Sequence, residues 1–305
     1  MVWTLAIPEL GRKRRRILLI DIAQNAVYGI VSGGILLLAS IGFSMVYRIE
    51  GFLNISHAEL LTVGAYIAVL FNVFLHFNLV LASILAIIIT AFIGLLIAKK
   101  LFSPMRKFGP LILLITSVGV AFAMHGITEF VAGPNIRTYN VKIPMAIKIG
   151  GYPFVSSNEI IIIVIAISSA LFLHLVLTRT KLGTAFRAMA SNFDLARVKG
   201  VDTDRMSTYV WLYASGMAAL AGVLLGLVTR VDTDLGWDQI LIIMSATILG
   251  GLGKIYGVMV GALVIGLAMD LGILVLPSSY RPAIALGIII VILLVKPSGI
   301  FGGEW

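Results

Sequence analysis

Polar side chains interrupt an apolar stretch of the sequence at residues 51–66, GFLNISHAELLTVGAY. Asn54, Ser56, His57 and Glu59 stand together at the start of this stretch. Polar groups are costly inside a lipid bilayer, and those that occur there tend to line cavities or solute paths. Zinc chemistry is not indicated, because the four histidines of the chain are scattered and no His/Glu spacing here matches a zinc site. The stretch therefore points to the passage of a solute.

These polar side chains would lie on two different faces of a helix. On a helix, Asn54 and His57 share a face that continues to Thr62, whereas Glu59 points elsewhere. Two interpretations of the shared face stay open: its side chains satisfy backbone groups at a helix break, or they contact a transported solute. We place Asn54, Ser56, His57 and Thr62 on a predicted substrate path.

A second interrupted stretch covers residues 238–252, DQILIIMSATILGGL, which are only 15 residues and begin with an acid and an amide. A helix needs about 20 residues to cross a bilayer, so this stretch predicts a half-helix or a broken helix. Short interrupted helices often line solute paths, and we therefore add Ser245 and Thr247 to the predicted substrate path. Among the intramembrane acids, Asp270 has two open interpretations, structural pairing and a role in the path.

The composition defines the class of protein that must position these residues. The chain has 305 residues, of which 60% are hydrophobic and 12% are charged, and its mean hydropathy is +1.07. So few charges cannot cover a soluble globule, which excludes a soluble enzyme. The apolar runs lack strict two-residue alternation and lipid cannot satisfy backbone polar groups, so the membrane segments should be helices and not barrel strands.

We predict an all-α polytopic membrane protein with about eight or nine membrane segments. It should be one transmembrane domain, 1–305, divided into these parts: a first half (17–132), an outer loop (133–157), a polar segment (180–205) and a second half (206–297). The chain has no cysteine, which excludes disulfides and thiolate metal sites. No polar catalytic constellation stands out, and we expect no catalytic residues, no metal and no cofactor.

Positive charge is concentrated in a few places. The net charge is +9, and 15 of the 23 basic residues (5 + 4 + 6) fall in residues 12–16, 99–107 and 179–205, which flank apolar runs. This distribution is typical of the positive-inside rule and not of a nucleic-acid groove. We therefore expect loops 99–109 and 180–205 to be cytoplasmic. Counting three crossings back from the first loop places the N-terminus outside, whereas residues 12–16 argue that it lies inside, and this conflict stays open.

Glycines recur near helical spacing in ATILGGLGKIYGVMVGALVIG, residues 246–266: Gly250, Gly251, Gly253, Gly257 and Gly261. A stripe of glycines lets two membrane helices approach closely, and we assign these five residues to helix packing. A phosphate-binding loop is the alternative, but Ile255 follows Lys254 where that motif requires Ser or Thr. The chain is therefore not expected to bind or hydrolyse ATP.

The two halves of the sequence look weakly alike. Residues 29–66 and 211–257 each contain a glycine-bearing span, a polar interruption and a short helix rich in small residues. Two such units separated by an odd number of crossings would form inverted repeats with broken or short helices. In that arrangement the substrate path lies at the interface of the repeats.

The polar segment, residues 180–205, is the most water-compatible part of the chain. Six basic residues lie in it or beside it: Arg179, Lys181, Arg187, Arg197, Lys199 and Arg205. Gly183 and Gly200 are predicted to break helices, and Ser191 with Asp194 forms a predicted capping pair. Two interpretations are open: the segment docks on a soluble partner, or its basic residues contact anionic lipid.

Four stretches together resemble the permease family of branched-chain amino-acid ABC importers. The first is Gly51, Asn54, Ser56, His57, Gly64, Ala65 and Tyr66, with Ala58 in place of the family's glycine. The second, similar to the family's cytoplasmic signature, is Gly183, Arg187, Ala188, Asn192, Ala196, Gly200, Val201 and Asp202. The third is Ala246, Leu249, Gly250, Gly251, Gly253 and Gly257, with Lys254 as a departure. The fourth is the closing run from Lys296 to Gly302.

The resemblance implies a permease subunit of an ATP-binding-cassette importer in the plasma membrane. Such a subunit works with two cytoplasmic ATPase subunits, a second permease chain that is usually a non-identical homologue, and an extracytoplasmic solute-binding protein; lipid surrounds it, and no nucleic acid is involved. It would translocate branched-chain amino acids or a related small polar solute, such as another amino acid, an amide or urea, by alternating access. Ala58 and Lys254 depart from the family's sequence pattern, so the resemblance supports membership of the family more directly than it supports leucine-class solutes.

The resemblance also assigns ATPase coupling within the polar segment to Gly183, Arg187, Ala188, Asn192, Ala196 and Gly200. An ion-coupled secondary transporter of a small solute is the alternative function, which the inverted repeats and Asp270 would suit but which has no family resemblance behind it.

Overall fold

Helices make up nearly all of the computed structural model, which describes residues 6–141, 145–149 and 152–302. By length and composition, 8 helical stretches in this part of the chain could cross a membrane: Ile20–Glu50, Ile55–Phe74, Leu79–Phe108, Pro110–Ala132, Ser157–Arg179, Thr203–Val228, Ile255–Gly272 and Ser278–Val295. The shorter apolar stretch Trp237–Gly250 is the predicted half-helix. The predicted all-α membrane class and the count of eight or nine segments are therefore confirmed.

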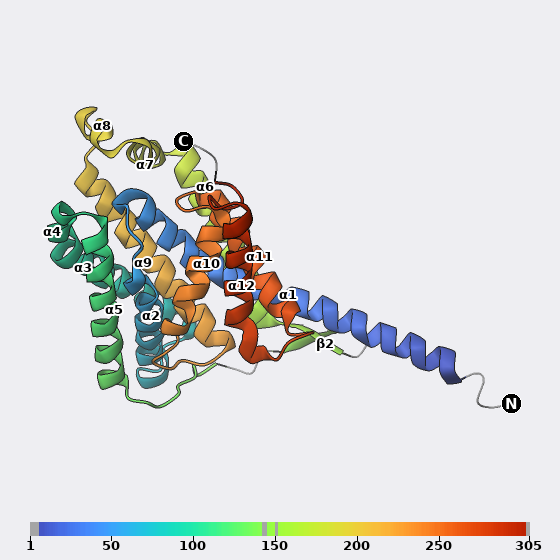
Figure 1. Cartoon of the computed structure of the whole chain (residues 1–305). Coiled ribbons are helices and arrows are strands. Elements are labelled where there is room, and N and C mark those ends of the chain that lie inside the picture. The colour runs from blue at the N-terminus through green and yellow to red at the C-terminus, as the bar shows by residue number, and fades with distance from the viewer. Residues whose placement is uncertain (1–5, 142–144, 150–151, 303–305) are drawn as a thin grey trace.

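The chain order of the elements is shown in Figure 1. The helices are α1 (Ala6–Glu50), α2 (Glu59–Val69), α3 (Leu79–Ile97), α4 (Ser103–Met105), α5 (Pro110–Ala132), α6 (Ser157–Arg179), α7 (Lys181–Ser191), α8 (Phe193–Val198), α9 (Thr203–Val228), α10 (Ile240–Gly250), α11 (Ile255–Gly272) and α12 (Arg281–Val295). Single turns extend α2 over Leu70–Phe74 and α3 over Ala98–Phe102. The turns Ile55–His57 and Trp237–Gln239 precede α2 and α10.

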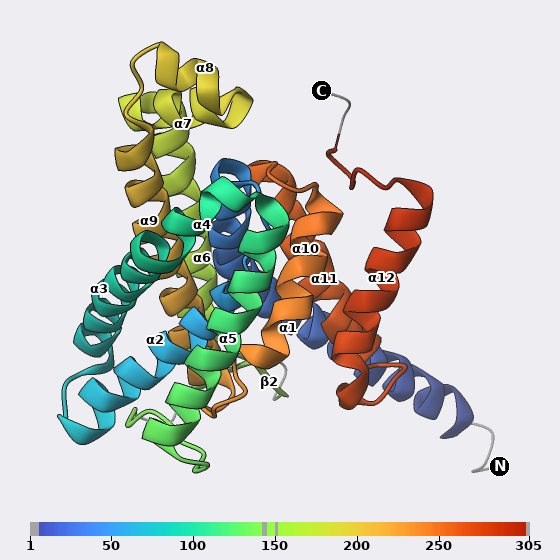
Figure 2. The same ribbon diagram turned by 60° about the vertical axis from the view of Figure 1, so that its left-hand side comes forward.

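The bundle has two ends that differ in charge. The loop 99–109, which contains α4, and the polar segment with α7 and α8 lie at one end, which we call the basic end (Figures 1 and 2). Strands β1 (Ala146–Ile149) and β2 (Tyr152–Ser156) lie at the opposite, hairpin end. Helix α1 runs without a break from the hairpin end to the basic end, so residues 12–16 belong to the part of α1 farthest from the other basic loops.

The strands β1 and β2 form an antiparallel hairpin inside the predicted outer loop, which the sequence analysis did not foresee. The outer loop also contains residues 142–144 and 150–151, which lie outside the described residues. Helix α6 begins directly after the hairpin with a capping box, in which Ser156 and Glu159 each accept a hydrogen bond from the other's backbone N–H. The hairpin is thereby joined to a membrane helix.

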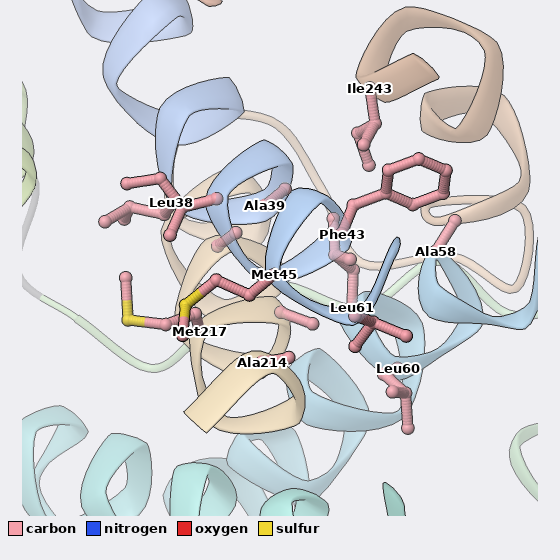
Figure 3. Packing of buried hydrophobic residues seen from close by; sticks show 14 of the residues in the cluster. Leu38, Ala39, Phe43, Met45, Ala58, Leu60, Leu61, Ala214, Met217 and Ile243 are labelled. Atoms are coloured by element: carbon pink, nitrogen blue, oxygen red, sulfur yellow. The ribbon is translucent and has the colours of Figure 1, made fainter. Parts of the chain in front are cut away.

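Buried apolar side chains from α1, α2, α9 and α10 form the core of the bundle. Figure 3 shows Phe43 of α1 beside Ile243 of α10, with Leu61 of α2 and Met217 of α9 in the same cluster. Phe43, Leu61 and Ile243 are almost completely buried. In contrast, α3, α5, α6 and α12 expose many large apolar side chains, as expected for helices that face lipid or another membrane protein.

Glycines allow the innermost helices to touch through their backbones. A Cβ atom added to Gly222 of α9 would collide with the backbone of Leu61 in α2, and one added to Gly64 would collide with Ala219 in α9. Gly266 of α11 lies in the same way on the backbone of Gly33 in α1. Close contacts of this kind drive helix association where lipid removes the hydrophobic contribution.

The predicted glycine stripe has two roles in the structure. Gly250 of α10 and Gly257 of α11 face each other backbone to backbone, and Gly261 lies against the backbone of Ala246. Gly251 and Gly253 instead have φ angles of 98° and 76°, which a side chain would strain, and they form the turn between α10 and α11. Helix packing thus accounts for three of the five glycines and turn geometry for the other two.

Two long helices, each followed by an interruption and a short helix, run in opposite directions. Helix α1 ends at the basic end before the break 51–58 and α2, and α9 ends at the hairpin end before the break 229–239 and α10. The breaks meet: the backbone N–H of Gly236 donates to Thr62 Oγ1 at 2.9 Å, and Gly236 lies against the carbonyl of Ala58. This is the geometry that an inverted repeat with broken helices predicts.

Candidate substrate path and coupling segment

The first break holds three of the predicted path residues in internal hydrogen bonds. Ser56 Oγ donates to Asn54 Oδ1 at 2.7 Å, and His57 Nε2 lies 3.0 Å from the carbonyl oxygen of Ala39. Asn54, Ser56 and His57 are all buried. The His57 ring also packs edge-on against Phe43. In this conformation the first interpretation of these residues, satisfaction of polar groups at a helix break, describes His57 best.

Ser117 of α5 belongs to the same break, although sequence reasoning did not select it. The backbone N–H of Ile55 donates to Ser117 Oγ at 3.1 Å, and Ser117 Oγ lies 2.7 Å from the carbonyl of Leu114. A serine in an apolar run 62 residues downstream gives no sequence signal of this contact. Helix α5 is thus fixed to the start of α2 by a polar contact inside the membrane.

The remaining predicted path residues are also buried. Thr62 accepts the hydrogen bond from Gly236 that joins the two breaks. Ser245 and Thr247 of α10 donate to the carbonyls of Leu241 and Ile243, one turn earlier in their own helix. The structure therefore brings the path residues of the first break and Thr62 together, while Ser245 and Thr247 lie along α10. Their contact with a solute stays a prediction.

A polar cavity of about 830 Å³ opens at the hairpin end between α1, α9, α10 and the start of α12. Its lining combines apolar side chains such as Leu36 and Met269 with charged ones, Glu159, Asp238 and Arg281. A mixed lining of this kind suits a small solute that carries both charge and apolar surface. A larger groove of about 1080 Å³ between α2, α3 and α5 is lined almost wholly by apolar side chains, so it does not suit a polar solute.

Asp270 is paired in the structure. Its carboxylate, which is completely buried in α11, forms an ion pair with Arg281 at the start of α12. Of the two interpretations left open by the sequence, structural pairing therefore describes Asp270. Its partner Arg281 also lines the polar cavity, so the ion pair lies beside that cavity. Glu129, the other intramembrane acid, is exposed on α5.

A second polar cluster lies where α2, α5 and the break 229–239 meet. His125 of α5 has Nδ1 3.6 Å from Glu59 Oε1 and Nε2 3.6 Å from Asp234 Oδ1. The ring of Trp237 lies 5.4 Å from that of His125, and the ring of Phe122 lies 5.1 Å from that of Trp237. Sequence reasoning noted Glu59 but missed its partners, because they are far from it in the sequence.

Three side-chain caps divide the polar segment into short helices. Thr180 accepts from the N–H of Gly183 before α7, Asn192 from Leu195 before α8, and Asp202 from Arg205 before α9. The predicted capping pair Ser191 and Asp194 is therefore wrong: Ser191 is the last residue of α7, and Asn192, whose Oδ1 accepts from the backbone N–H of Leu195 three residues later, is the cap of α8.

Gly183 does not break a helix, contrary to prediction. It lies within α7 and is buried against the last carbonyls of α6, where a side chain would collide with the carbonyl of Leu177. Gly200 does end a helix, because its φ of 87° is the left-handed conformation that commonly follows a helix C-terminus. One glycine thus positions α7 on α6, and the other turns the chain from α8 into α9.

The predicted coupling residues divide between the interior and the surface of the polar segment: Gly183 is buried, whereas Arg187, Asn192 and Gly200 are exposed. Arg187 donates to the carbonyl of Leu177 and to Thr184, so its guanidinium caps the end of α6. Ala196 is buried and Ala188 is half-buried. The outer surface also carries apolar side chains that sequence reasoning did not select: Leu182, Leu195 and Val198 are exposed beside the basic residues. A surface that mixes apolar and basic groups suits a protein partner.

Residues 25–295 match the model of the family described as the branched-chain amino acid transport system permease component. The chain belongs to this permease family. It is 29% identical over 298 residues to the high-affinity branched-chain amino acid permease protein LivH of Salmonella typhimurium, covering 92% of this chain and 95% of the relative.

The chain is also similar to a second curated permease and to one solved structure. The permease is 29% identical over 292 residues to BraD of Pseudomonas aeruginosa, a protein of the same description, covering 92% of this chain and 95% of the relative. Among solved structures, PsaBC from Streptococcus pneumoniae in complex with Fab is similar, with a TM-score of 0.46, 14% identity and coverage of 93% of each chain.

Family membership and the eight apolar helices together place the permease in the plasma membrane as a multi-pass protein. It is a transport subunit and not an enzyme. The polar cavity, the two breaks and the outer surface of the polar segment are therefore features of a transporter.

Proposed function

We propose that this permease is the membrane subunit of an ATP-driven importer for branched-chain amino acids or a related small polar solute. The observation that carries the proposal is an exposed surface of apolar and basic side chains on α7 and α8, at the basic end of a chain of this family. One of two cytoplasmic ATPase subunits docks there, a second permease chain completes the membrane part, and an external binding protein delivers the solute at the hairpin end.

The way the polar segment is attached supports alternating access. Helix α7 is held to α6 by Gly183 and Arg187, and α8 leads directly into α9. A displacement of the polar segment is therefore passed to α9, which packs against α2 through glycines. Because α9 and α2 border the two breaks, movement at the basic end changes the side on which a solute can enter.

Reconstitution of the whole transporter in liposomes tests the proposal. The measurement is uptake of labelled leucine, isoleucine and valine, with and without internal ATP and with an imposed ion gradient. Uptake that needs ATP, the ATPases and the binding protein supports the importer. Uptake driven by the ion gradient alone would instead identify an ion-coupled carrier.

A substitution at the outer surface of α8 should separate the permease from its ATPases. Val198 is 82% exposed at the end of α8, so Val198→Asp leaves the fold of the permease unchanged. A carboxylate in a buried apolar contact is costly, and we expect recovery of the ATPases with the purified permease to fall about tenfold. The measurement is co-purification from membranes that contain all subunits.

Val275 provides a matched control for this experiment. It is 86% exposed, lies after α11 at the hairpin end, and can receive the same substitution. Val275→Asp should leave co-purification of the ATPases at the wild-type level. If Val198→Asp retains the ATPases as well as Val275→Asp does, α8 is not the docking surface.

A further inference from the structure

A buried carboxylate without a hydrogen-bond donor marks the cluster formed by Glu59, His125, Asp234 and Trp237. The side chain of Glu59 is 1% exposed. Within the described part of the chain, neither of its carboxylate oxygens accepts a hydrogen bond, and the Nδ1 atom of His125 has no hydrogen-bond partner either. A buried carboxylate normally requires a cation or several donors to offset its desolvation, whereas Glu59 faces only the His125 ring, whose Nδ1 is 3.6 Å from Oε1 and makes no hydrogen bond to it.

The groups around Glu59 have the chemistry of a cation site. Asp234 adds a second carboxylate on the far side of the His125 ring, and its side chain is 62% exposed. Trp237 supplies an aromatic face beside them, and tryptophan is the side chain that attracts cations most strongly through its ring. A solute that brings a primary ammonium group would meet two carboxylates and an aromatic ring here.

The position of the cluster connects it with the route of a solute. Trp237 also lines the polar cavity at the hairpin end, so one residue borders both the cavity and the cluster. Glu59 opens α2 directly after the first break, and Asp234 and Trp237 lie on the second break. The hydrogen bond from Gly236 to Thr62 holds the two breaks together at this point.

We propose that Glu59, together with Asp234 and Trp237, binds the ammonium group of the transported solute, and that His125 occupies this position when no solute is present. The inference rests on the proposed function and narrows it: the solute is an amino acid with a free ammonium group, and amides or urea are rejected. His125 is a positioning residue that separates the two carboxylates in the empty site.

Binding of a matched pair of ligands to the purified permease, without the binding protein, tests the inference. Leucine and its 2-hydroxy analogue share the side chain and the carboxylate, and only leucine has an ammonium group. Binding is followed by equilibrium dialysis of labelled ligand at millimolar concentrations. We expect the wild-type permease to bind leucine about tenfold more tightly than the hydroxy acid, because a site built for a charged group rejects an analogue that lacks it.

Glu59→Gln should remove this preference. It should weaken leucine binding about tenfold and leave the affinity for the hydroxy acid unchanged. Glu129→Gln, which changes an exposed acid on α5, is the matched control and should bind both ligands as the wild type does. If Glu59→Gln does not fold, as judged by size-exclusion chromatography, Asp234→Asn at the exposed edge of the cluster should reduce the preference for leucine about threefold.

Three results would overturn the inference: no leucine binding by the wild-type permease, unchanged leucine binding in the folded variant, or equal weakening of both ligands. Each of these binding results is compatible with normal ATP-dependent leucine uptake by the whole transporter. In that case the ammonium site would be wrong and the proposed function would stand. Absence of that uptake would count against the proposed function itself.

Discussion

Gly222→Ala is expected to prevent the permease from folding. The added methyl group would collide with the backbone of Leu61 in α2, and a backbone atom cannot move aside as the end of a flexible side chain can. Separation of α9 from α2 would disturb the core that contains Met217 and Leu61, at a cost of about 3 kcal/mol. The measurement is the yield of monodisperse protein in size-exclusion chromatography after detergent extraction.

Gly126 and Gly287 are matched controls for this substitution. Both lie in membrane helices, α5 and α12, and a Cβ atom at either position would meet nothing within 4 Å. Alanine has the higher helix propensity by about 1 kcal/mol, so Gly126→Ala and Gly287→Ala should keep or raise the yield. A normal yield for Gly222→Ala would show that α2 and α9 are not in backbone contact.

Glu50→Ala should destabilise the basic end of the bundle and impair coupling. The Oε1 atom of Glu50 accepts from Arg106 at 2.5 Å, Ser207 at 2.7 Å and Trp211 at 2.9 Å. The carboxylate is 2% exposed and joins the end of α1 to the loop 99–109 and to α9. Its removal leaves the Arg106 guanidinium without its counter-ion, at a cost of about 3 kcal/mol.

Two readouts separate the structural part of this effect from the functional part. Thermal unfolding of the purified complex should occur at a lower temperature in Glu50→Ala than in the wild type. Below that temperature, the variant should hydrolyse more ATP for each solute transported, because α9 is less firmly joined to α1. Glu129→Ala removes an exposed acid and should change neither measurement. If Glu50→Ala unfolds at the same temperature as the wild type, the hydrogen bonds of Glu50 do not stabilise the basic end.

The sequence predicts the features of this permease that depend on local patterns. Apolar runs of bilayer length define eight spans, and the run 238–252 is short enough to indicate a half-helix. Glycines at four-residue intervals predict close helix packing, and Gly257 and Gly261 of α11 do lie against the backbone of α10. Basic residues in loops predict which two loops share one end of the bundle.

Features that join distant parts of the chain could not be predicted in this way. Glu50 and Trp211 are separated by 161 residues, and no pattern in either neighbourhood indicates the other. His125 lies in an apolar helix and shows its relation to Glu59 only when α5 packs on α2. The prediction of the cap was wrong for a local reason: Ser191, Asn192 and Asp194 are all suitable caps, and because α7 continues through Ser191, the cap of α8 is Asn192.

The contact between Gly236 and Thr62 limits the intermediates of a transport cycle. A backbone amide from one half of the chain is satisfied by a hydroxyl from the other half, and both groups are buried. A conformation in which one short helix has moved and the other has not would leave both groups unsatisfied. Such half-switched molecules should be rare, so labels on α2 and α10 should report a single concerted transition between two populations.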